Sequence, residues 1–344
     1  MHPPLLAVSL GCPAGIGPEV AVRAAAELRA ARCVLVGDPA VVRAAAELRA
    51  VSLRRLVPVA SRREMDRLGP REIGVFACGA ALGQAAVPGK PDGAAGAAQL
   101  RWIDRACDLV LSGACDALVT GPVSKAHVVA SGAPGARRFR GHTEHLARRT
   151  GAAEVIMAFR SQKLTTALVT THLPLHAVPG AITPGAVARA CFWLADLLAR
   201  LGASRPRVAV AGLNPHAGES GLLGSEEQTG IVPGMRAARV RLRRAGSAAE
   251  LVGPVGAETA FRLAAAGAYD GVVAMYHDQA TIACKLLGFG EAVNVTLGLP
   301  IVRTSVDHGT AYDLAGTGRA SARGMRSAME LATLLVAGPR ASRH

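Results

Sequence analysis

The sequence predicts an α/β protein built on parallel β-sheets, and three observations carry that prediction. Short runs rich in β-branched residues alternate along the chain with Ala/Leu/Arg stretches of helical period, the order expected for parallel strands joined by crossover helices. The short runs are apolar at successive positions, as in strands buried on both faces. With 344 residues, the chain is long enough for two such domains.

The predicted elements follow that alternation in order. Six runs are predicted as buried strands: LLAVSL at 5–10, CVLVG at 33–37, ALVTG at 117–121, LTTALVTT at 164–171, RVAVAGL at 207–213 and GVVAMY at 271–276. The main helices are expected at 19–30, 39–50, 93–111 and 184–201. One segment, 21–30, recurs almost verbatim at 41–50, and two similar amphipathic helices explain a single recurrence.

Charge and composition narrow the class of partner. The formal net charge is +14, but the basic residues are dispersed as single Arg, and aromatic residues make up only 3% of the chain. Few side chains are therefore available to stack on bases, which argues against nucleic acid and favours a small anionic substrate. No apolar run approaches the length that spans a membrane, so no membrane association is expected.

Cysteine usage and the N-terminus indicate a cytoplasmic protein. The seven cysteines are scattered, odd in number and never in a C-x-x-C pair, which argues for a reducing compartment and against a disulfide framework. The N-terminus has no basic segment before its short apolar stretch, so a signal peptide is not expected.

A compositional bias marks several residues as candidates for a functional site. The chain has 35 Arg, four Lys and two Asn. Both asparagines, Asn214 and Asn294, and two of the lysines, Lys125 and Lys285, lie in Gly/His/Asp-rich segments. A sequence so biased towards Arg keeps Lys mainly where a compact donor or a titrating amine is needed, which favours site roles for these residues.

Polar or glycine-rich clusters follow nearly every predicted strand. They read GCPAGIGPE, TGPVSK, THLPLH, GLNPHAGE and YHDQ. Ligands of α/β sheets bind beyond the carboxyl ends of the strands, so position alone nominates these loops for chemistry.

Three histidines occupy equivalent positions just after strands: His172, His216 and His277. A lone histidine there is more often a hydrogen-bonded structural residue than a ligand. Three imidazoles with open positions suit a catalytic divalent ion such as Zn²⁺, although ligands so far apart in sequence form no local motif.

Further polar residues could bind an anionic substrate. His142 and Thr143 stand at the expected start of a helix, where they either cap it or donate to an anion. Lys285, Asn294 and Arg303 follow the YHDQ cluster at nine-residue intervals. Each alone could be a solvated surface residue, whereas together they would form a pocket for phosphate and carboxylate.

Two glycine-rich loops, 11–20 and 305–320, are candidates for binding a larger ligand. Neither has the G-x-G-x-x-G spacing, so a Rossmann domain is not indicated. Glycine would let the backbone approach a ligand closely, and loop flexibility is the alternative explanation.

These motifs together resemble the 4-hydroxythreonine-4-phosphate dehydrogenase family of pyridoxal phosphate biosynthesis. The resemblance runs from Gly11 to about Arg319, with GxPAGIGPE, TGPVSK, GHTE, THLPL, GLNPHAGE, YHDQ, VNVTLGLP and DHGTAxDLAGTG in that order. It implies an isocitrate/isopropylmalate dehydrogenase-like fold, in which two α/β/α domains flank a cleft. We expect 1–129 with 305–344 to form the cofactor-side domain and 130–304 the metal and dimer side.

The resemblance also implies roles for individual residues. It implies that His172, His216 and His277 bind a divalent metal (Zn, Mg or Co). It implies that the substrate is contacted by His142, Thr143, Lys285, Asn294 and Arg303. Lys285 or Asp278 could transfer protons. The stretch from 307 resembles an adenosine-side loop, which puts His308, Gly309 and Thr310 near NAD or NADP, with Gly15 and Gly17 as further cofactor contacts.

The implied reaction is oxidation of a small phosphorylated hydroxy acid, 4-hydroxythreonine 4-phosphate, followed by decarboxylation to 3-amino-2-oxopropyl phosphate. The family is homodimeric with shared active sites, which would put His277 of one subunit opposite His172 and His216 of the other.

This chain departs from the family pattern at two positions, and the second departure, at Glu258, leaves the substrate open. Cys12 and Glu258 stand where the family usually has Asp. Similar enzymes act on threonate or erythronate 4-phosphate or on a cyclic dihydrodiol. A phosphate acyltransferase of similar fold, a metal-dependent hydrolase and a basic nucleic-acid-binding protein are more distant alternatives.

Overall fold

The chain divides into two compact units. The computed structural model describes residues 3–288 and 290–338. The first unit holds the chain up to Ala152 together with Leu299–Ala337, and the second holds Ala153–Gly298.

These limits differ from the expected domain boundaries, 129/130 and 304/305. The segments 130–152 and 299–304 belong to the first unit. The reason is apolar packing, because Phe139 and Leu146 are buried in the first unit's core and Leu299 packs against it.

The first unit is built on a parallel sheet whose spatial order differs from its chain order. Its strands are β1 (Leu5–Ser9), β2 (Arg32–Gly37), β3 (Leu56–Pro58), β4 (Ile73–Ala77), β5 (Ala117–Thr120) and β12 (Val302–Val306). The order is β3-β4-β2-β1-β5-β12, and each neighbouring pair is parallel. The order reverses at β1, because β2 lies on one side of it and β5 on the other.

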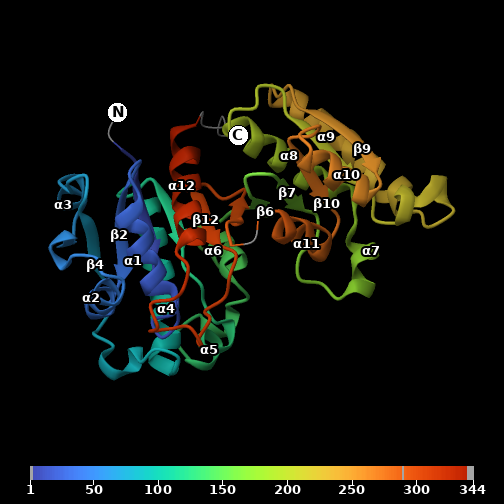
Figure 1. Cartoon of the computed structure of the whole chain (residues 1–344). Helices are drawn as coiled ribbons and strands as arrows, with labels where there is room; N and C mark the ends of the chain where they lie inside the picture. The colour runs from blue at the N-terminus through green and yellow to red at the C-terminus, as the bar shows by residue number, and fades with distance from the viewer. Residues whose placement is uncertain (1–2, 289, 339–344) are drawn as a thin grey trace. The chain divides into compact units, whose positions relative to one another are not determined.

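Helices cover both faces of this sheet. They are α1 (Gly17–Glu27), α2 (Pro39–Leu48), α3 (Arg62–Asp66), α4 (Gly93–Leu111), α5 (Lys125–Ala130), α6 (His142–Thr150) and α12 (Arg323–Ala337), with 3-10 turns η1 (Leu53–Arg55), η2 (Gly83–Ala86) and η3 (Ala136–Arg138). Adjacent residues of a strand point to opposite faces. Val34 lies in a core cluster with Leu100 of α4, whereas the Cys33 Sγ lies 4.0 Å from the Met329 Sδ of α12. Thus α4 covers one face, and α12, with α1 beside it, covers the other (Figure 1).

The second unit contains a mixed sheet. Its strands are β6 (Ile156–Arg160), β7 (Thr165–Leu168), β8 (Arg207–Ala211), β9 (Glu250–Val255), β10 (Gly271–Ala274) and β11 (Val293–Leu297), in the order β11-β6-β7-β10-β8-β9. β7, β10 and β8 are parallel as predicted, and β9, a strand that the sequence reasoning did not identify, is parallel to β8. β6 is antiparallel to both of its neighbours. The chain has only residues 161–164 between β6 and β7, too few for the crossover that a parallel pair requires.

The second unit is also three-layered. Its helices are α7 (Val178–Ala181), α8 (Pro184–Arg200), α9 (Val232–Arg244), α10 (Ala257–Ala265) and α11 (His277–Gly288), with 3-10 turns η4 (Leu175–Ala177) and η5 (Pro215–Gly221) and the π-helical turn η6 (Glu227–Ile231). Phe261 of α10 and Cys284 of α11 share a core cluster with Val272 of β10. A Cβ at Gly271 would instead contact Leu194 and Leu198 of α8. The predicted α/β/α layering is therefore confirmed in each unit.

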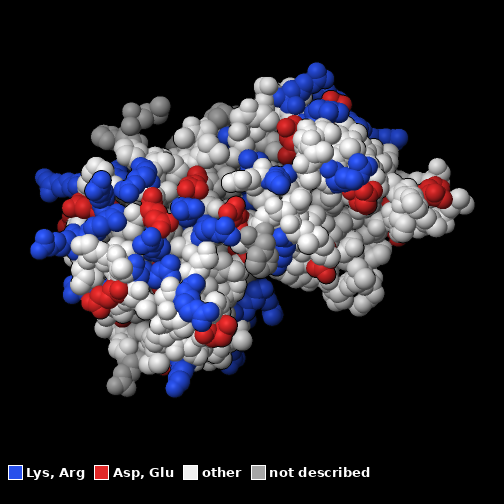
Figure 2. Space-filling model, in the orientation of Figure 1, with Lys and Arg blue, Asp and Glu red and all other residues white. Residues whose placement is uncertain are grey.

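On the face drawn in Figure 2, basic side chains are scattered among uncharged and acidic ones rather than gathered in one patch. Within the described ranges, no single helix is long and apolar enough to cross a membrane, and one pair, Leu175–Ala181 with Pro184–Arg200, passes that test only jointly and is bent by 88°.

Candidate active site

Three loops leave the first sheet where its strand order reverses. The loop after β1 begins GCPAG, and the loop after the adjacent β5 begins GPVSK. β12 lies on the other side of β5 and leads into the glycine-rich stretch 307–320. Ligands of open α/β sheets bind at the carboxyl ends of the strands at such a reversal, so we expect these loops to form the ligand-binding edge of the first unit.

Gly15 and Gly17 pack against the chain itself. A Cβ at Gly15 would lie 2.8 Å from the Thr310 carbonyl oxygen, and a Cβ at Gly17 would lie 2.1 Å from the Leu10 carbonyl oxygen. The Ile16 N–H donates to the Thr310 carbonyl at 3.0 Å. These contacts give both glycines a packing reason, so their contact with a cofactor stays a prediction.

The 308–310 segment offers a more open backbone. A Cβ at Gly309 would meet no heavy atom within 4 Å. The His308 Nδ1 lies 3.0 Å from the Gly309 carbonyl oxygen, and its Nε2 is buried without a hydrogen-bond partner among the described residues. Gly309 therefore has the space that close approach of a ligand to the backbone requires, and His308 has a ring nitrogen left for one.

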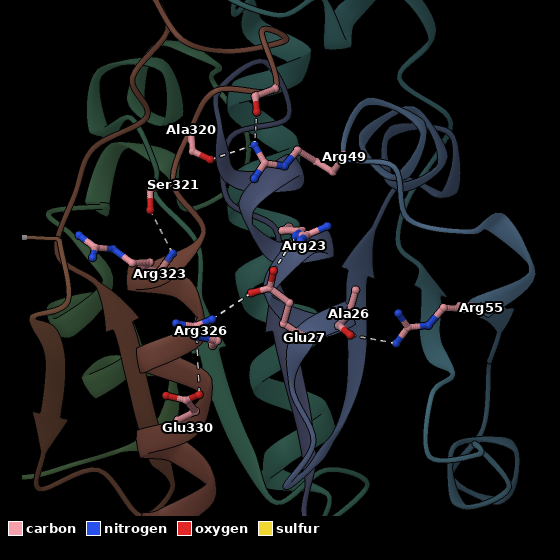
Figure 3. A network of polar contacts seen from close by, with 11 residues as sticks. Arg23, Ala26, Glu27, Arg49, Arg55, Ala320, Ser321, Arg323, Arg326 and Glu330 are labelled. Carbon is pink, nitrogen blue, oxygen red and sulfur yellow. Dashed lines mark hydrogen bonds and ion pairs between the residues drawn. The ribbon is translucent and has the colours of Figure 1, made fainter.

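Arg49, at the end of α2, fixes the later part of the same stretch. Its guanidinium donates to the carbonyl oxygens of Gly318 and, at 2.9 Å, of Ala320 (Figure 3). The same Nη1 lies 3.9 Å from the carboxylate of Glu19, which is 3% exposed. Burial raises the pKa of Glu19, and the charge of Arg49 opposes that shift. Arg49 thus ties the glycine-rich stretch to α1.

Arg303 is buried on β12 next to β5. It is 2% exposed, and its Nη2 donates to the Thr120 Oγ1 at 2.6 Å. Burial lowers the pKa of Arg303 to about 9, and the carboxylate of Glu144 on α6 opposes the shift. A buried guanidinium at the carboxyl end of the sheet is suited to holding an anionic group.

His142 is the first residue of α6 and lies near Arg303. The N-cap is Gly141, with no side-chain capping bond, so the capping explanation for His142 and Thr143 does not hold. Burial, followed by the charges of Arg303, His145 and Lys125, lowers the pKa of His142 well below its ordinary value. The ring is therefore neutral at pH 7, and its Nε2 is buried without a hydrogen-bond partner among the described residues.

Lys125 completes this group; the sequence reasoning favoured a site role for it but assigned it no specific contact. It begins α5, in the TGPVSK motif. A Cβ at Gly141 would lie 3.5 Å from the Lys125 Nζ and 2.9 Å from a Glu144 carboxylate oxygen, so both side chains border the N-terminus of α6. The available signal was the rarity of lysine. We refer to Lys125, His142 and Arg303 as the basic cluster.

The three predicted metal-binding histidines follow three adjacent parallel strands of the second unit. His172 follows β7, His277 follows β10 and His216 follows β8, and the order of these strands is β7-β10-β8. The Thr170 Oγ1 donates to the Met275 carbonyl oxygen at 2.8 Å. The Gln279 Nε2 donates to the Gly212 carbonyl oxygen at 3.0 Å. These bonds join each outer loop to the central one.

His172 and His277 lie together. Their ring centroids are 5.6 Å apart at an interplanar angle of 44°. Two imidazoles on one tetrahedral zinc ion would have centroids roughly 5 Å apart, given Zn–N distances of about 2 Å. The His277 Nδ1 is 2.6 Å from the Asp278 Oδ1, the carboxylate contact that orients a ligating imidazole and leaves Nε2 for a metal. This pair fits one divalent ion.

His216 does not join that pair within one chain. Across 3–288 and 290–338, no group of three His, Cys, Asp or Glu side chains could hold a metal ion. His216 begins a run of left-handed backbone that ends at Ser220. Such a conformation costs roughly 1–2 kcal/mol for each residue other than glycine, so this loop is strained.

The remaining residues predicted for the site lie on separate elements and do not form one cluster. Lys285 is exposed on α11, two turns and about 12 Å along the axis from His277. Asn294 lies on β11, paired with Phe159 of β6. Glu258, the departure from the family pattern, begins α10, is exposed and bonds Arg262 at 2.8 Å.

Comparison with known proteins gives a match over almost the whole chain. The model of the pyridoxal phosphate biosynthetic protein PdxA family matches residues 29–332. The chain is 42% identical over 340 residues to a 4-hydroxythreonine-4-phosphate dehydrogenase of Desulfosudis oleivorans, covering 96% of each protein. It is 45% identical over 335 residues to that of Aromatoleum aromaticum, covering 97% of each.

Solved structures agree with the sequence matches. A 4-hydroxythreonine-4-phosphate dehydrogenase from Klebsiella pneumoniae is similar with a TM-score of 0.82 and 36% identity, covering 97% of this chain and 99% of that one. A terephthalate 1,2-cis-dihydrodiol dehydrogenase from Burkholderia xenovorans gives 0.67 and 30%, covering 96% and 98%. The EutD phosphotransacetylase of Staphylococcus aureus, at 12% identity and a TM-score of 0.53, shares only the fold.

Proposed function

This chain belongs to the PdxA family of pyridoxal phosphate biosynthetic proteins, and we propose that it is a 4-hydroxythreonine-4-phosphate dehydrogenase. The observation that carries the proposal is the identity of 42–45% to enzymes of that name over nearly the full chain. The substrate hydroxyl is oxidised while NAD or NADP accepts a hydride, and the β-keto acid so formed loses CO₂ to give 3-amino-2-oxopropyl phosphate.

We assign the metal to the second unit. His172 and His277 would hold one divalent ion (Zn, Mg or Co), with Asp278 orienting the ring of His277. A bound divalent ion lowers the pKa of a ligated hydroxyl and stabilises negative charge on its oxygen. Asp278 is thereby committed to His277, and Lys285 lies about 12 Å along α11 from His277, so a proton-transfer role for Lys285 rests on the resemblance alone.

The third ligand comes from the partner subunit. The sequence reasoning assigned that role to His277, but the closeness of His277 to His172 in one chain supports His216 instead. The protein would then be a homodimer whose active sites are shared.

Exposed apolar side chains around the histidines support such a dimer. Among the described residues, the four most exposed large apolar side chains lie within nine positions of His172, His216 or His277. They are Leu222 at 83%, Leu286 at 81%, Leu175 at 71% and Ile282 at 60%. Leu173 and Leu223 are exposed in the same segments. Side chains of this kind gain most from burial against a second copy of the chain.

We assign substrate and cofactor binding to the first unit. The basic cluster carries two positive charges and a neutral imidazole donor beside the N-terminus of α6, a combination that suits a phosphate group. Thr143 of α6 is kept as a further substrate contact, and so is Asn294, which lies on β11 of the second unit. Gly309 and His308, with Thr310, Gly15 and Gly17 behind them, are the proposed NAD(P) contacts.

A cytoplasmic location accords with the cysteines. None of the seven forms a disulfide in the described part of the chain, and six of them are buried. A reducing compartment suits such a protein.

A second candidate reaction has one specific observation in its favour. The dihydrodiol dehydrogenase of Burkholderia xenovorans is 30% identical to this chain over 96% of its length. Such a substrate carries carboxylates but no phosphate, and we rank it second because the identity of 30% is lower than the 42–45% to the 4-hydroxythreonine-4-phosphate dehydrogenases. Threonate and erythronate 4-phosphates differ less and are tested directly.

The test is a matrix of substrates and nucleotides. Purified protein with a divalent metal and either NAD or NADP is incubated with each phosphorylated acid or the dihydrodiol, and nucleotide reduction is followed by absorbance. We expect reduction with 4-hydroxythreonine 4-phosphate, its loss on chelation, and its return on adding metal. Reduction only with another substrate would overturn the assignment, and turnover in verified metal-free protein would overturn the metal site.

A further inference from the structure

The backbone of the segment that carries His216 is left-handed over five consecutive residues. From His216 to Ser220 the φ angles are 52°, 54°, 78°, 41° and 58°, and only Gly218 is a glycine. Residues with a Cβ rarely adopt this region, and then usually singly. A run of this kind persists only where its surroundings hold it in place.

The buried carboxylate of Glu227 holds the base of this turn. Glu227 begins η6 and is 4% exposed. Its Oε1 accepts from the Leu213 N–H and the Asn214 N–H, both at 2.8 Å. Its Oε2 accepts from the Asn214 Nδ2 at 2.9 Å. One side chain therefore binds two consecutive backbone donors immediately before the left-handed run.

Glycines bring the turn close to that carboxylate. A Cβ at Gly218 would lie 2.7 Å from the Glu227 Oε2, and a Cβ at Gly212 would lie 3.3 Å from its Oε1 and 2.9 Å from the Ala217 Cα. The carboxylate is thus packed against both ends of the segment that carries His216.

The neighbouring Glu226 also accepts a hydrogen bond from the side chain of Asn214. The bond joins the Glu226 Oε2 to the Asn214 Nδ2 at 2.8 Å, and it lowers the pKa of Glu226. Glu226 is thus a carboxylate next to Glu227 that bonds the same Asn214 side chain. Substituting Glu226 therefore provides a matched control for substituting Glu227.

We infer that Glu227 is a positioning residue that holds His216 in the left-handed turn from which it binds metal. The inference rests on the proposed function, because it takes His216 as a metal ligand. Glu227 does not touch the metal or the substrate. It acts through the backbone of Leu213 and Asn214, on which the direction of the His216 ring depends. Interactions that orient a ligand in this way typically change metal affinity 10–100-fold when removed.

The test measures zinc affinity by competition with a chromophoric chelator on the full-length protein, without turnover. Glu227→Ala is expected to weaken zinc binding about 10–100-fold, Glu227→Gln less, since an amide oxygen can still accept the two backbone N–H bonds, and Glu226→Ala less than about threefold. Circular dichroism and thermal unfolding of the metal-free proteins report whether each variant is folded. If Glu227→Ala does not fold, Glu227→Gln, measured against Glu226→Gln, carries the test.

A double variant separates positioning from general loosening. If Glu227 acts through His216, adding Glu227→Ala or Glu227→Gln to His216→Ala should weaken zinc binding by less than about twofold beyond the single His216 variant. Wild-type affinity in both folded Glu227 variants, or a full additional loss in the double variant, overturns the inference and leaves the metal site standing. A wild-type protein that does not bind zinc overturns the proposed metal site itself.

Discussion

Subunit complementation tests which histidine crosses to the partner. The perturbation is a set of single variants, His172→Ala, His216→Ala and His277→Ala, each expected to be nearly inactive alone. The ring centroids of His172 and His277 are 5.6 Å apart in one chain, so these two would serve the same site and His216 would serve the partner's site. In a dimer of a His172 variant with a His216 variant, one site then carries both lesions and the other carries neither.

The recovered activity follows from counting sites. Equal amounts of two variants that exchange subunits at random give about half mixed dimers, and each mixed dimer has one intact site of two, so about a quarter of all sites should recover. The pair His277→Ala with His216→Ala should behave in the same way. The pair His172→Ala with His277→Ala should recover nothing, because every site keeps one lesion.

The assay is nucleotide reduction before and after subunit exchange, with exchange verified by native mass spectrometry of differently tagged chains. Recovery by His172→Ala with His277→Ala would return His277 to the partner's side and refute the reasoning from the ring distance. No recovery in any pair, despite confirmed exchange, would mean that all three ligands come from one chain or that the sites are not shared.

Three further predictions concern the first unit. Arg303→Lys keeps the positive charge but loses the planar, two-pronged guanidinium. It should raise KM for the phosphorylated substrate at least about tenfold, because a charged hydrogen bond worth roughly 1.5–3 kcal/mol is lost, and it should leave KM for NAD(P) unchanged. Burial keeps the His142 ring neutral in the folded protein, whereas the ring binds a proton near its ordinary pKa in the unfolded chain. The free energy of unfolding of the wild type, measured in urea, should therefore fall as the pH is lowered below about 6.5, by up to about 1.4 kcal/mol per pH unit more than that of His142→Gln. Equal dependence of stability on pH in the two proteins would contradict the buried neutral ring. Gly309→Ala should leave Tm unchanged, since its Cβ meets nothing within 4 Å, while raising KM for NAD(P); an unchanged KM would remove Gly309 from the cofactor site.

The strands that precede the three histidines could be predicted because apolar residues bury them on both faces, whereas β12, which carries Arg303, was not predicted. All six predicted runs form strands, at β1, β2, β5, β7, β8 and β10, because a strand buried on both faces requires consecutive apolar residues. The position of each histidine just beyond a strand followed from the same pattern. The pattern does not indicate which strands pair with one another. The structure was therefore needed to show that β6 is antiparallel and that β7, β10 and β8 are neighbours.

The basic cluster was only partly predictable for a different reason. His142 and Arg303 were identified by motif, but Lys125 was noticed only as a rare residue type. Its contribution depends on the N-terminus of α6 lying beside that of α5, a contact between segments whose spacing in sequence carries no signal. Arg303 illustrates the same limit, because its apolar strand neighbours indicate burial, whereas its bond to Thr120 depends on β12 pairing with β5.

On the assignments that we propose, the two units divide the chemistry between them, and this division accords with their different architectures. In the first unit the ligand-binding edge consists of backbone loops fixed by close glycine packing and by Arg49, which suits recognition of anionic groups by N–H donors and buried cations. In the second unit the corresponding edge carries imidazoles, each on a loop joined to its neighbour by a side-chain amide or hydroxyl. Anion binding tolerates several donor geometries, whereas a metal requires its ligands at fixed distances. On the proposal that His216 binds metal, that difference gives a reason for the strained turn, because an ordinary right-handed turn after β8 would direct the ring elsewhere. It also gives a reason for the buried carboxylate of Glu227, which bonds the backbone at the base of the turn.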